Sequence, residues 1–206
     1  MNVTAYNCPN CGARINELAK IARMAACDSC DTALLIEDEV VRATGQKGVM
    51  HEATSLFDIG DTVKAGDSSV LLRGKARFSY GRGFWDEFWG LDAVGKPVWI
   101  SLDEGDVAVQ RELVDASLSR AVQNADIGDA ITLGRREFVI SEIETAECVA
   151  LRGAFDHELK VGESYEFINA LGKNGALLSY EYWIGGAQLY LGQWFSPFDI
   201  EVEAAP

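Results

Sequence analysis

Short runs of aliphatic and aromatic residues follow one another between residues 55 and 203, with Gly, Asn or Asp between them. Examples are SVLLRGKARFSY, PVWISLDEGDVAV, AITLGRREFVISEI, ECVALRGAF, GALLSYEYWIG and AQLYLGQWF. β-Branched and aromatic residues favour strands, and the intervening residues favour turns. The pattern therefore predicts a mainly β protein in which residues 55–203 form an antiparallel sandwich or barrel.

The β region contains an internal repeat. DIGDTV begins at residue 58 and DIGDAI at residue 126, 68 residues later, and each is followed by a Gly and an apolar run. A weaker similarity relates EFWGLDAVGKPVWIS to EFINALGKNGALLS. We expect two related halves, at about 55–115 and 124–200, that pack as one core because each alone would be marginally stable.

Two other segments contain good helix formers. QRELVDASLSRAVQNA places Leu113, Leu118 and Val122 near helical spacing, which predicts a short helix between the two halves. INELAKIARMAA, near the N-terminus, has helix formers too, but zinc ribbons commonly place a hairpin at this point. Both alternatives stay open for residues 13–25.

Four of the five cysteines form two pairs near the N-terminus. Each pair encloses two residues, and fifteen residues separate the pairs. This is the spacing of a zinc ribbon, in which two C-x-x-C turns supply four thiolates to one ion. We predict a structural Zn²⁺ site at Cys8, Cys11, Cys27 and Cys30.

Each C-x-x-C turn needs a residue that tolerates positive φ after its second cysteine. Gly12 occupies that place in the first turn and Asp31 in the second, and Asp adopts this conformation more readily than most residues. We place the zinc ribbon at residues 1–43 and a linker at 44–54, where the apolar periodicity stops.

Other roles for the cysteines fit the sequence less well. A redox dithiol usually has one C-x-x-C in a βαβ setting, and disulfides require an oxidising compartment. A catalytic zinc needs an open coordination position, which four thiolates do not leave. Cys148 lies in an apolar run without a partner at metal spacing, so we interpret it as a small buried hydrophobic residue.

The charge of the chain restricts its partners. The chain has 18 Lys and Arg against 32 Asp and Glu, a net charge of −14, and such a surface repels phosphate backbones and anionic lipids. The sequence shows no membrane span of about 18 apolar residues and no signal-peptide pattern. We expect a cytoplasmic protein that neither binds nucleic acid nor inserts into a membrane.

FWDEFWGLD is the densest aromatic segment. On a strand, Asp86 and Phe88 share one face while Trp85 and Glu87 share the other. One face belongs to the core, and the other either packs on the second half or is an exposed binding surface. The candidate surface consists of Phe84, Trp85, Asp86, Glu87, Phe88, Trp89 and Trp99.

The sequence contains no catalytic constellation that we recognise. Asp86 and Glu87 point in opposite directions on a strand, so they do not form an acid–base pair, and we expect them at a solvated edge. His51 and His157 lie in a linker and a charged turn, without a neighbouring nucleophile motif. We predict no catalytic residues.

The paired cysteine turns, the two DIGD segments and EFWGLD followed by WIS resemble a bacterial and archaeal family of unknown function, the domain of unknown function 4178 type. The resemblance covers nearly the whole chain and implies a zinc ribbon before a β domain. Relatives are encoded beside phage-shock-type membrane-stress proteins, membrane proteins and aminopropyltransferase-like enzymes. This setting implies an accessory or adaptor role.

Two functions follow as hypotheses. The first is a non-enzymatic adaptor that binds a protein partner, linked to membrane-stress systems. The alternative is an enzyme or accessory subunit that binds a cationic small molecule such as a polyamine, held by aromatic faces and by carboxylates such as Asp86, Glu87 or Asp92.

Overall fold

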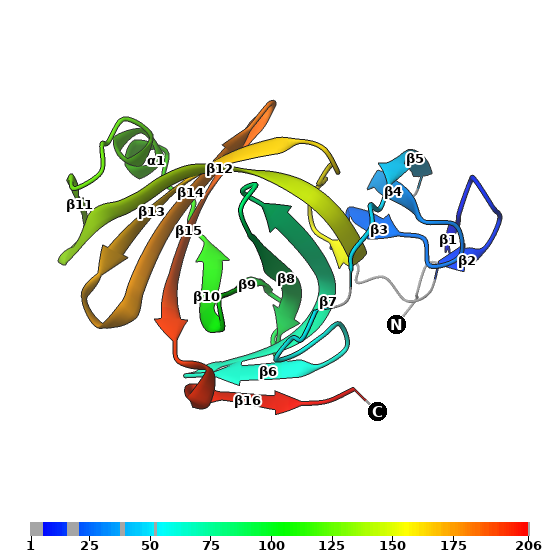
Figure 1. The fold of residues 1–206 in the computed structure, drawn as a ribbon, viewed down its shortest axis with the longest axis horizontal. Helices are drawn as coiled ribbons and strands as arrows, with labels where there is room; N and C mark the ends of the chain where they lie inside the picture. The colour runs from blue at the N-terminus through cyan, green and yellow to red at the C-terminus, as the bar shows by residue number, and fades with distance from the viewer. Residues whose placement is uncertain (1–5, 16–20, 38–39, 52, 206) are drawn as a thin grey trace.

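The computed structural model describes residues 6–15, 21–37, 40–51 and 53–205 (Figure 1). Strands make up most of this part of the chain, as predicted. The N-terminal strands are β1 (Tyr6–Asn7), β2 (Arg14–Ile15), β3 (Met24–Ala26), β4 (Thr32–Glu37) and β5 (Val40–Gln46). The first half of the β domain contains β6 (Thr62–Ala65), β7 (Ser68–Ser79), β8 (Phe84–Asp92), β9 (Pro97–Asp103) and β10 (Asp106–Glu112). The helix α1 (Ala116–Gln123) follows. The second half then contains β11 (Ala130–Leu133), β12 (Arg136–Phe155), β13 (Ser164–Gly172), η1 (Lys173–Gly175), β14 (Ala176–Trp183) and β15 (Gly186–Phe195), and the chain continues with η2 (Pro197–Asp199) and β16 (Ile200–Glu203).

Eight of the described strands close an antiparallel barrel, in the order β7, β8, β9, β10, β15, β14, β13 and β12. Two pairings join the halves: β10 with β15, where Val107 is opposite Phe195, and β12 with β7, where Leu151 is opposite Ala76. Closure pairs the edges that an open sheet would expose. The structure thus selects the barrel from the two predicted architectures.

The two DIGD segments form the same turn. Asp58 N–H donates to Asp61 Oδ2 at 2.8 Å, and Asp126 N–H donates to Asp129 Oδ2 at 2.9 Å. Each turn leads into a short strand, β6 or β11, and then into the long strand β7 or β12, so the strands follow in the same order in both halves. That the two halves are related stays a prediction.

Other elements cover the outside of the barrel. One outer cluster lies under β6 and β16 and includes the fully buried Val70 and Phe88. The second lies under α1 and β11, where Leu118 and Val122 of the helix pack against Phe138. Asp115 caps the N-terminus of the helix, where its side chain accepts hydrogen bonds from two backbone N–H groups of the first turn. This is the helix predicted between the halves. In the described part of the chain, no helix has the length and apolarity needed to span a membrane.

The cysteine-containing segment joins the barrel through a shared strand pairing. β3 pairs with β4 and with the end of β12, where Ala25 is opposite Ala154. β5 extends to Gln46, beyond the predicted end of the ribbon at residue 43. Residues 16–20, on which the choice between helix and hairpin depends, lie outside the described residues; Met24–Ala26 are a strand.

Candidate functional site

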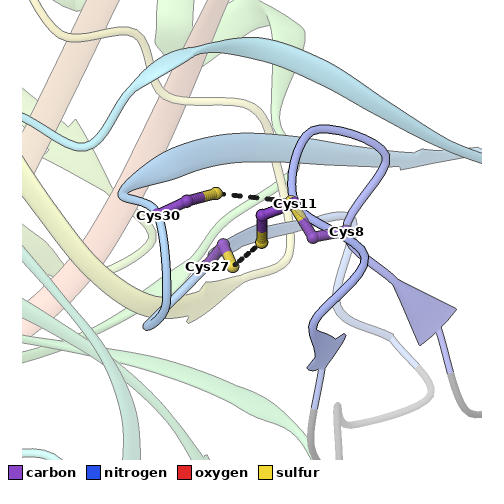
Figure 2. A group of neighbouring side chains, drawn as sticks. All are labelled: Cys8, Cys11, Cys27 and Cys30. Atoms are coloured by element: carbon purple, nitrogen blue, oxygen red, sulfur yellow. Dashed lines mark hydrogen bonds between the residues drawn. The ribbon is translucent and has the colours of Figure 1, made fainter.

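The sulfurs of the four paired cysteines lie within 4.8 Å of one another (Figure 2). The Sγ atoms of Cys8 and Cys30 are 3.6 Å apart, and those of Cys11 and Cys27 are 3.8 Å apart. Thiolates about 2.3 Å from a tetrahedral Zn²⁺ are about 3.8 Å from one another, whereas bonded sulfurs are about 2.05 Å apart. The donor set therefore fits Zn²⁺ in both chemistry and spacing.

Two matching turns bring these sulfurs together. Gly12 N–H donates to Cys8 O at 2.8 Å, and Asp31 N–H donates to Cys27 O at 3.0 Å. Gly12 has φ 75° and Asp31 has φ 62°, so both adopt the left-handed conformation expected from the sequence. Asp31 also forms an ion pair with Lys47, at 2.6 Å, which ties the second turn to the end of β5.

Donors surround the Cys30 sulfur. The Thr32 hydroxyl lies 3.2 Å from Cys30 Sγ and lowers the pKa of Cys30 to about 6. Asn10 Nδ2 lies 3.5 Å from the same sulfur. Such donors favour the thiolate, which is the form that binds metal.

The barrel encloses a cavity of about 330 Å³ whose lining residues come from all eight barrel strands. Aromatic rings form much of its wall: Phe78, Tyr80, Trp85, Tyr165, Phe167 and Trp194. Six carboxylate side chains of the described residues also line it: Glu87, Asp103, Glu104, Glu142, Glu144 and Glu181. A barrel of eight strands is wide enough to hold one small ligand among its interior side chains.

Glu87 is buried in this wall within a short hydrogen-bond network. Its Oε1 accepts from Trp85 Nε1 at 3.0 Å and from Ser101 Oγ at 2.8 Å. Ser101 Oγ in turn accepts from Gln110 Nε2 at 3.3 Å. Burial raises the pKa of Glu87 to about 7, because water no longer solvates the charge and these hydrogen bonds offset only part of that loss.

Glu181 contributes a second carboxyl to the interior. Burial raises its pKa to about 8, and the charge of Glu87 adds to the shift. The pKa of Asp103 is also raised, by burial first and then by the charges of Glu104 and Glu142. The cavity therefore gathers carboxyl groups at places where their ionised forms are poorly solvated.

The cavity also contains hydrogen-bond acceptors without donors. Among the described residues, Asp103 Oδ1 and Gln110 Oε1 are buried and have no hydrogen-bond partner. The other two unpaired buried side-chain atoms, Trp89 Nε1 and Arg73 Nε, belong to residues outside the cavity wall. Native proteins pair nearly all such groups, so these acceptors point to a ligand that supplies donors.

The loop between β12 and β13, residues 156–163, closes one end of the barrel. His157 lies between two tryptophans, with ring centroids 5.3 Å from Trp99 and 6.1 Å from Trp183. His157 Nδ1 is 2.9 Å from Asp156 Oδ1. Leu159 is buried beneath it, in the same cluster as Trp99. We name residues 156–163 the plug.

The structure separates the residues of the predicted aromatic surface. Trp85 and Glu87 line the cavity, while Phe88 and Trp89 are fully buried and Trp99 packs against the plug. Phe84 is 47% exposed, and its ring lies 4.1 Å from the guanidinium carbon of Arg77.

The expectation that Asp86 and Glu87 lie at a solvated edge is wrong. Both are buried, on opposite sides of the barrel wall. Asp86 accepts two hydrogen bonds from Arg77, at 2.7 and 2.9 Å, and lies 3.3 Å from Lys75 Nζ. The sequence did not reveal this pairing because it depends on the register between β7 and β8. Asp92, the third carboxylate named for cation binding, lies outside the cavity wall and pairs with Arg111 at 2.9 Å.

Most of the cavity carboxylates were not predicted from the sequence. The available signal was the alternation of polar residues with aromatic ones in part of an otherwise apolar strand, as with Ser179 and Glu181 in β14. Cys148, predicted as a buried hydrophobic residue, is buried, and burial raises its pKa to about 12.

A family model described as a domain of unknown function, DUF4178, matches residues 58–197, more than half of the chain. The chain belongs to the DUF4178 family. The DUF4178 match begins at the first residue of DIGDTV and includes all eight barrel strands, while the four clustered cysteines precede it. The family resemblance recognised in the sequence is therefore confirmed. Searches of curated proteins and of solved structures found no match to the chain.

Proposed function

We propose that the DUF4178 barrel is a non-enzymatic module that binds a small organic cation, such as a polyamine, in its interior. The observation that carries the proposal is the cavity itself, where carboxylates and unpaired acceptors lie between aromatic rings. The cation binding predicted as part of the alternative function thus becomes the main proposal, without an enzymatic role. Of the three carboxylates first named for it, Glu87 is the one that lines the cavity.

The chemistry of the wall favours a positive ligand. An ionised carboxylate in poorly solvated surroundings is costly unless a counter-charge is present, and the charge of Glu87 increases that cost for Glu181. An ammonium group would supply both the charge and the N–H donors that Asp103 and Gln110 lack. The faces of Trp85 and Trp194 suit the methylene groups and the cationic ends of such a ligand.

We assign the cysteine cluster a structural role in holding Zn²⁺. The described segment is too small to form a large core, so metal binding would provide much of its folding free energy. Thiolate sites of this kind persist where thiols stay reduced, which agrees with the cytoplasmic location that we propose.

A protein partner and a link to membrane-stress systems stay predictions. Of the seven residues predicted for a binding surface, Phe84 is the exposed one. A cation-loaded barrel could still present other surfaces to a partner, and affinity capture with the ligand present would test this.

The decisive experiment is calorimetric titration of the zinc-loaded chain, residues 1–206, with spermidine. We expect saturable, stoichiometric heat that is lost in the Glu87→Gln/Glu181→Gln double variant. Glu147→Gln is the control for loss of a carboxylate outside the cavity, because Glu147 is exposed on the outer face of β12. Heat that does not saturate, or equal binding by the double variant, would refute the proposal.

A further inference from the structure

The cysteine-containing segment meets the barrel at its plugged end. β3 extends the sheet at the end of β12, with Met24 opposite Phe155 and Ala25 opposite Ala154. Arg23 N–H also donates to Phe155 O at 2.7 Å. The plug begins at the residue after Phe155, so β3 holds the chain at the point where it enters the plug.

Met24 makes the closest contact with the plug. Its side chain is fully buried, and its sulfur accepts a hydrogen bond from Leu159 N–H at 3.2 Å. Met24 and Leu159 belong to one buried cluster with Trp99 and Phe155. An apolar side chain from the cysteine segment therefore completes the core at this end of the barrel.

The plug in turn contacts the base of the cavity. His157 and Leu159 line a small space at the plugged end together with Glu87, Glu181 and Tyr190. Glu87 and Glu181 also line the large cavity. The plug and the proposed cation site thus share two carboxylates.

The position of Met24 depends on the metal site. Cys27 is three residues along the chain from Met24, and the intervening Ala25 packs in a cluster with Cys8, Cys27 and Ala154. Without an ion, four thiolates have nothing to hold them together, and so small a segment loses much of its folding free energy. Loss of zinc would therefore release β3 and withdraw Met24 from the plug.

We propose that zinc in the cysteine cluster locks the plug, so that loss of zinc loosens residues 156–163 and weakens retention of the cation in the barrel. The second half of this proposal rests on the proposed cation-binding function. The proposal requires no oxidation of the cysteine thiolates, because another ligand that competes for zinc can remove the ion.

Hydrogen exchange of the chain, residues 1–206, measured by mass spectrometry with and without a zinc chelator, tests the lock in the absence of spermidine. Metal removal should speed exchange in residues 156–163 while β14 and β15 stay protected. Unchanged exchange in the plug would overturn the lock. Loss of protection throughout the barrel would overturn it too, because zinc would then stabilise the whole fold.

A Met24→Ala variant separates the lock from metal binding. All four cysteines remain, so the variant should retain zinc at the wild-type ratio and still show faster exchange in the plug. Ile21→Ala, a deletion of similar size at a side chain that is 39% exposed, is the matched control and should leave the plug protected. A Met24→Ala variant with a fully protected plug would contradict the proposed contact.

Spermidine titration with and without zinc tests the link to the ligand. We expect zinc removal to weaken binding about tenfold, within the usual range for coupling between two sites. A loosened plug with unchanged spermidine affinity would overturn the link. A loosened plug in a protein that never binds spermidine would refute the proposed function and leave the lock supported.

Discussion

Arg77 and Asp86 form a two-point ion pair inside the wall of the protein, with Nε 2.7 Å from Oδ1 and Nη2 2.9 Å from Oδ2. Arg77 also donates to the backbone carbonyl of His51 at 2.8 Å, so the pair holds the segment that leads from the cysteine region into the barrel. Lys75 Nζ lies 3.3 Å from the same carboxylate.

Asp86→Ala should therefore destabilise the protein strongly. Two buried cations would lose their counter-charge, and breaking a buried pair in this way typically costs about 3–5 kcal/mol. Urea unfolding of the zinc-loaded chain measures the change. Glu203→Gln removes a carboxylate that pairs with Lys64 at the exposed edge and should shift the midpoint little. Equal effects of the two variants would show that the buried ion pair contributes no more to the stability of the protein than the exposed one does.

The stability of the barrel should fall as pH rises from about 5 to about 8. Glu87 and Glu181 have pKa values of about 7 and about 8 in the folded protein, above the ordinary 4.5, so folding favours their neutral forms. The folding stability that comes from these neutral carboxyl groups is complete below pH 4.5. It is lost as pH rises from there through about 7 for Glu87 and about 8 for Glu181. Urea unfolding at several pH values should show a smaller fall in Glu181→Gln than in Glu147→Gln. Parallel curves for the two variants would contradict the raised pKa of Glu181.

Cation binding should strengthen over the same pH interval. Glu87 and Glu181 lose their protons as pH rises through about 7 and about 8, and the ionised carboxylates attract an ammonium group. Spermidine affinity measured by calorimetry should therefore rise from pH 6 to pH 8.5. An affinity that is independent of pH would mean that other groups hold the ligand.

Cys27→Ser should lose zinc and leave the barrel folded. Three thiolates would remain at the site, whereas the barrel has its own interior and outer clusters. Metal analysis should show about one Zn²⁺ per wild-type chain and a marked loss in the variant. Cys148→Ser, away from the cluster, should retain the metal. If the barrel loses its cooperative unfolding together with the zinc, the predicted boundary between ribbon and β domain is wrong.

Closure of the barrel should be sensitive to Gly153. It lies opposite Gly74 where β12 meets β7, has φ 71°, and a Cβ there would be 2.2 Å from Arg73 O. Gly153→Ala therefore combines backbone strain of about 1–3 kcal/mol with a clash. Gly134→Ala isolates the strain, because Gly134 has φ 61° and open space around it. Urea unfolding should show a clearly larger loss of unfolding free energy for Gly153→Ala than for Gly134→Ala. Equal losses would mean that β12 and β7 move apart enough to accept the new Cβ without further destabilisation.

Local patterns in the sequence were sufficient to predict several features. The spacing of the cysteines and the residues after them predicted the two turns, because a turn depends on φ preferences over a few residues. Alternation along β8 predicted that Trp85 and Glu87 share one face and Asp86 and Phe88 the other, because strand geometry alone sets that relation. The DIGD segments likewise indicated where each half begins.

The tertiary structure decided which face of each strand became the interior. Both faces of β8 carry aromatic residues, so its sequence is compatible with either orientation, and the choice came from the pairing of β7 with β12 and of β10 with β15. That closure turned Glu87 inward to the same cavity as Glu181, from a distant strand, and placed Asp86 beside Arg77. Such contacts depend on long-range register, which short stretches of sequence leave undetermined because hairpins of this kind fit either a sandwich or a barrel.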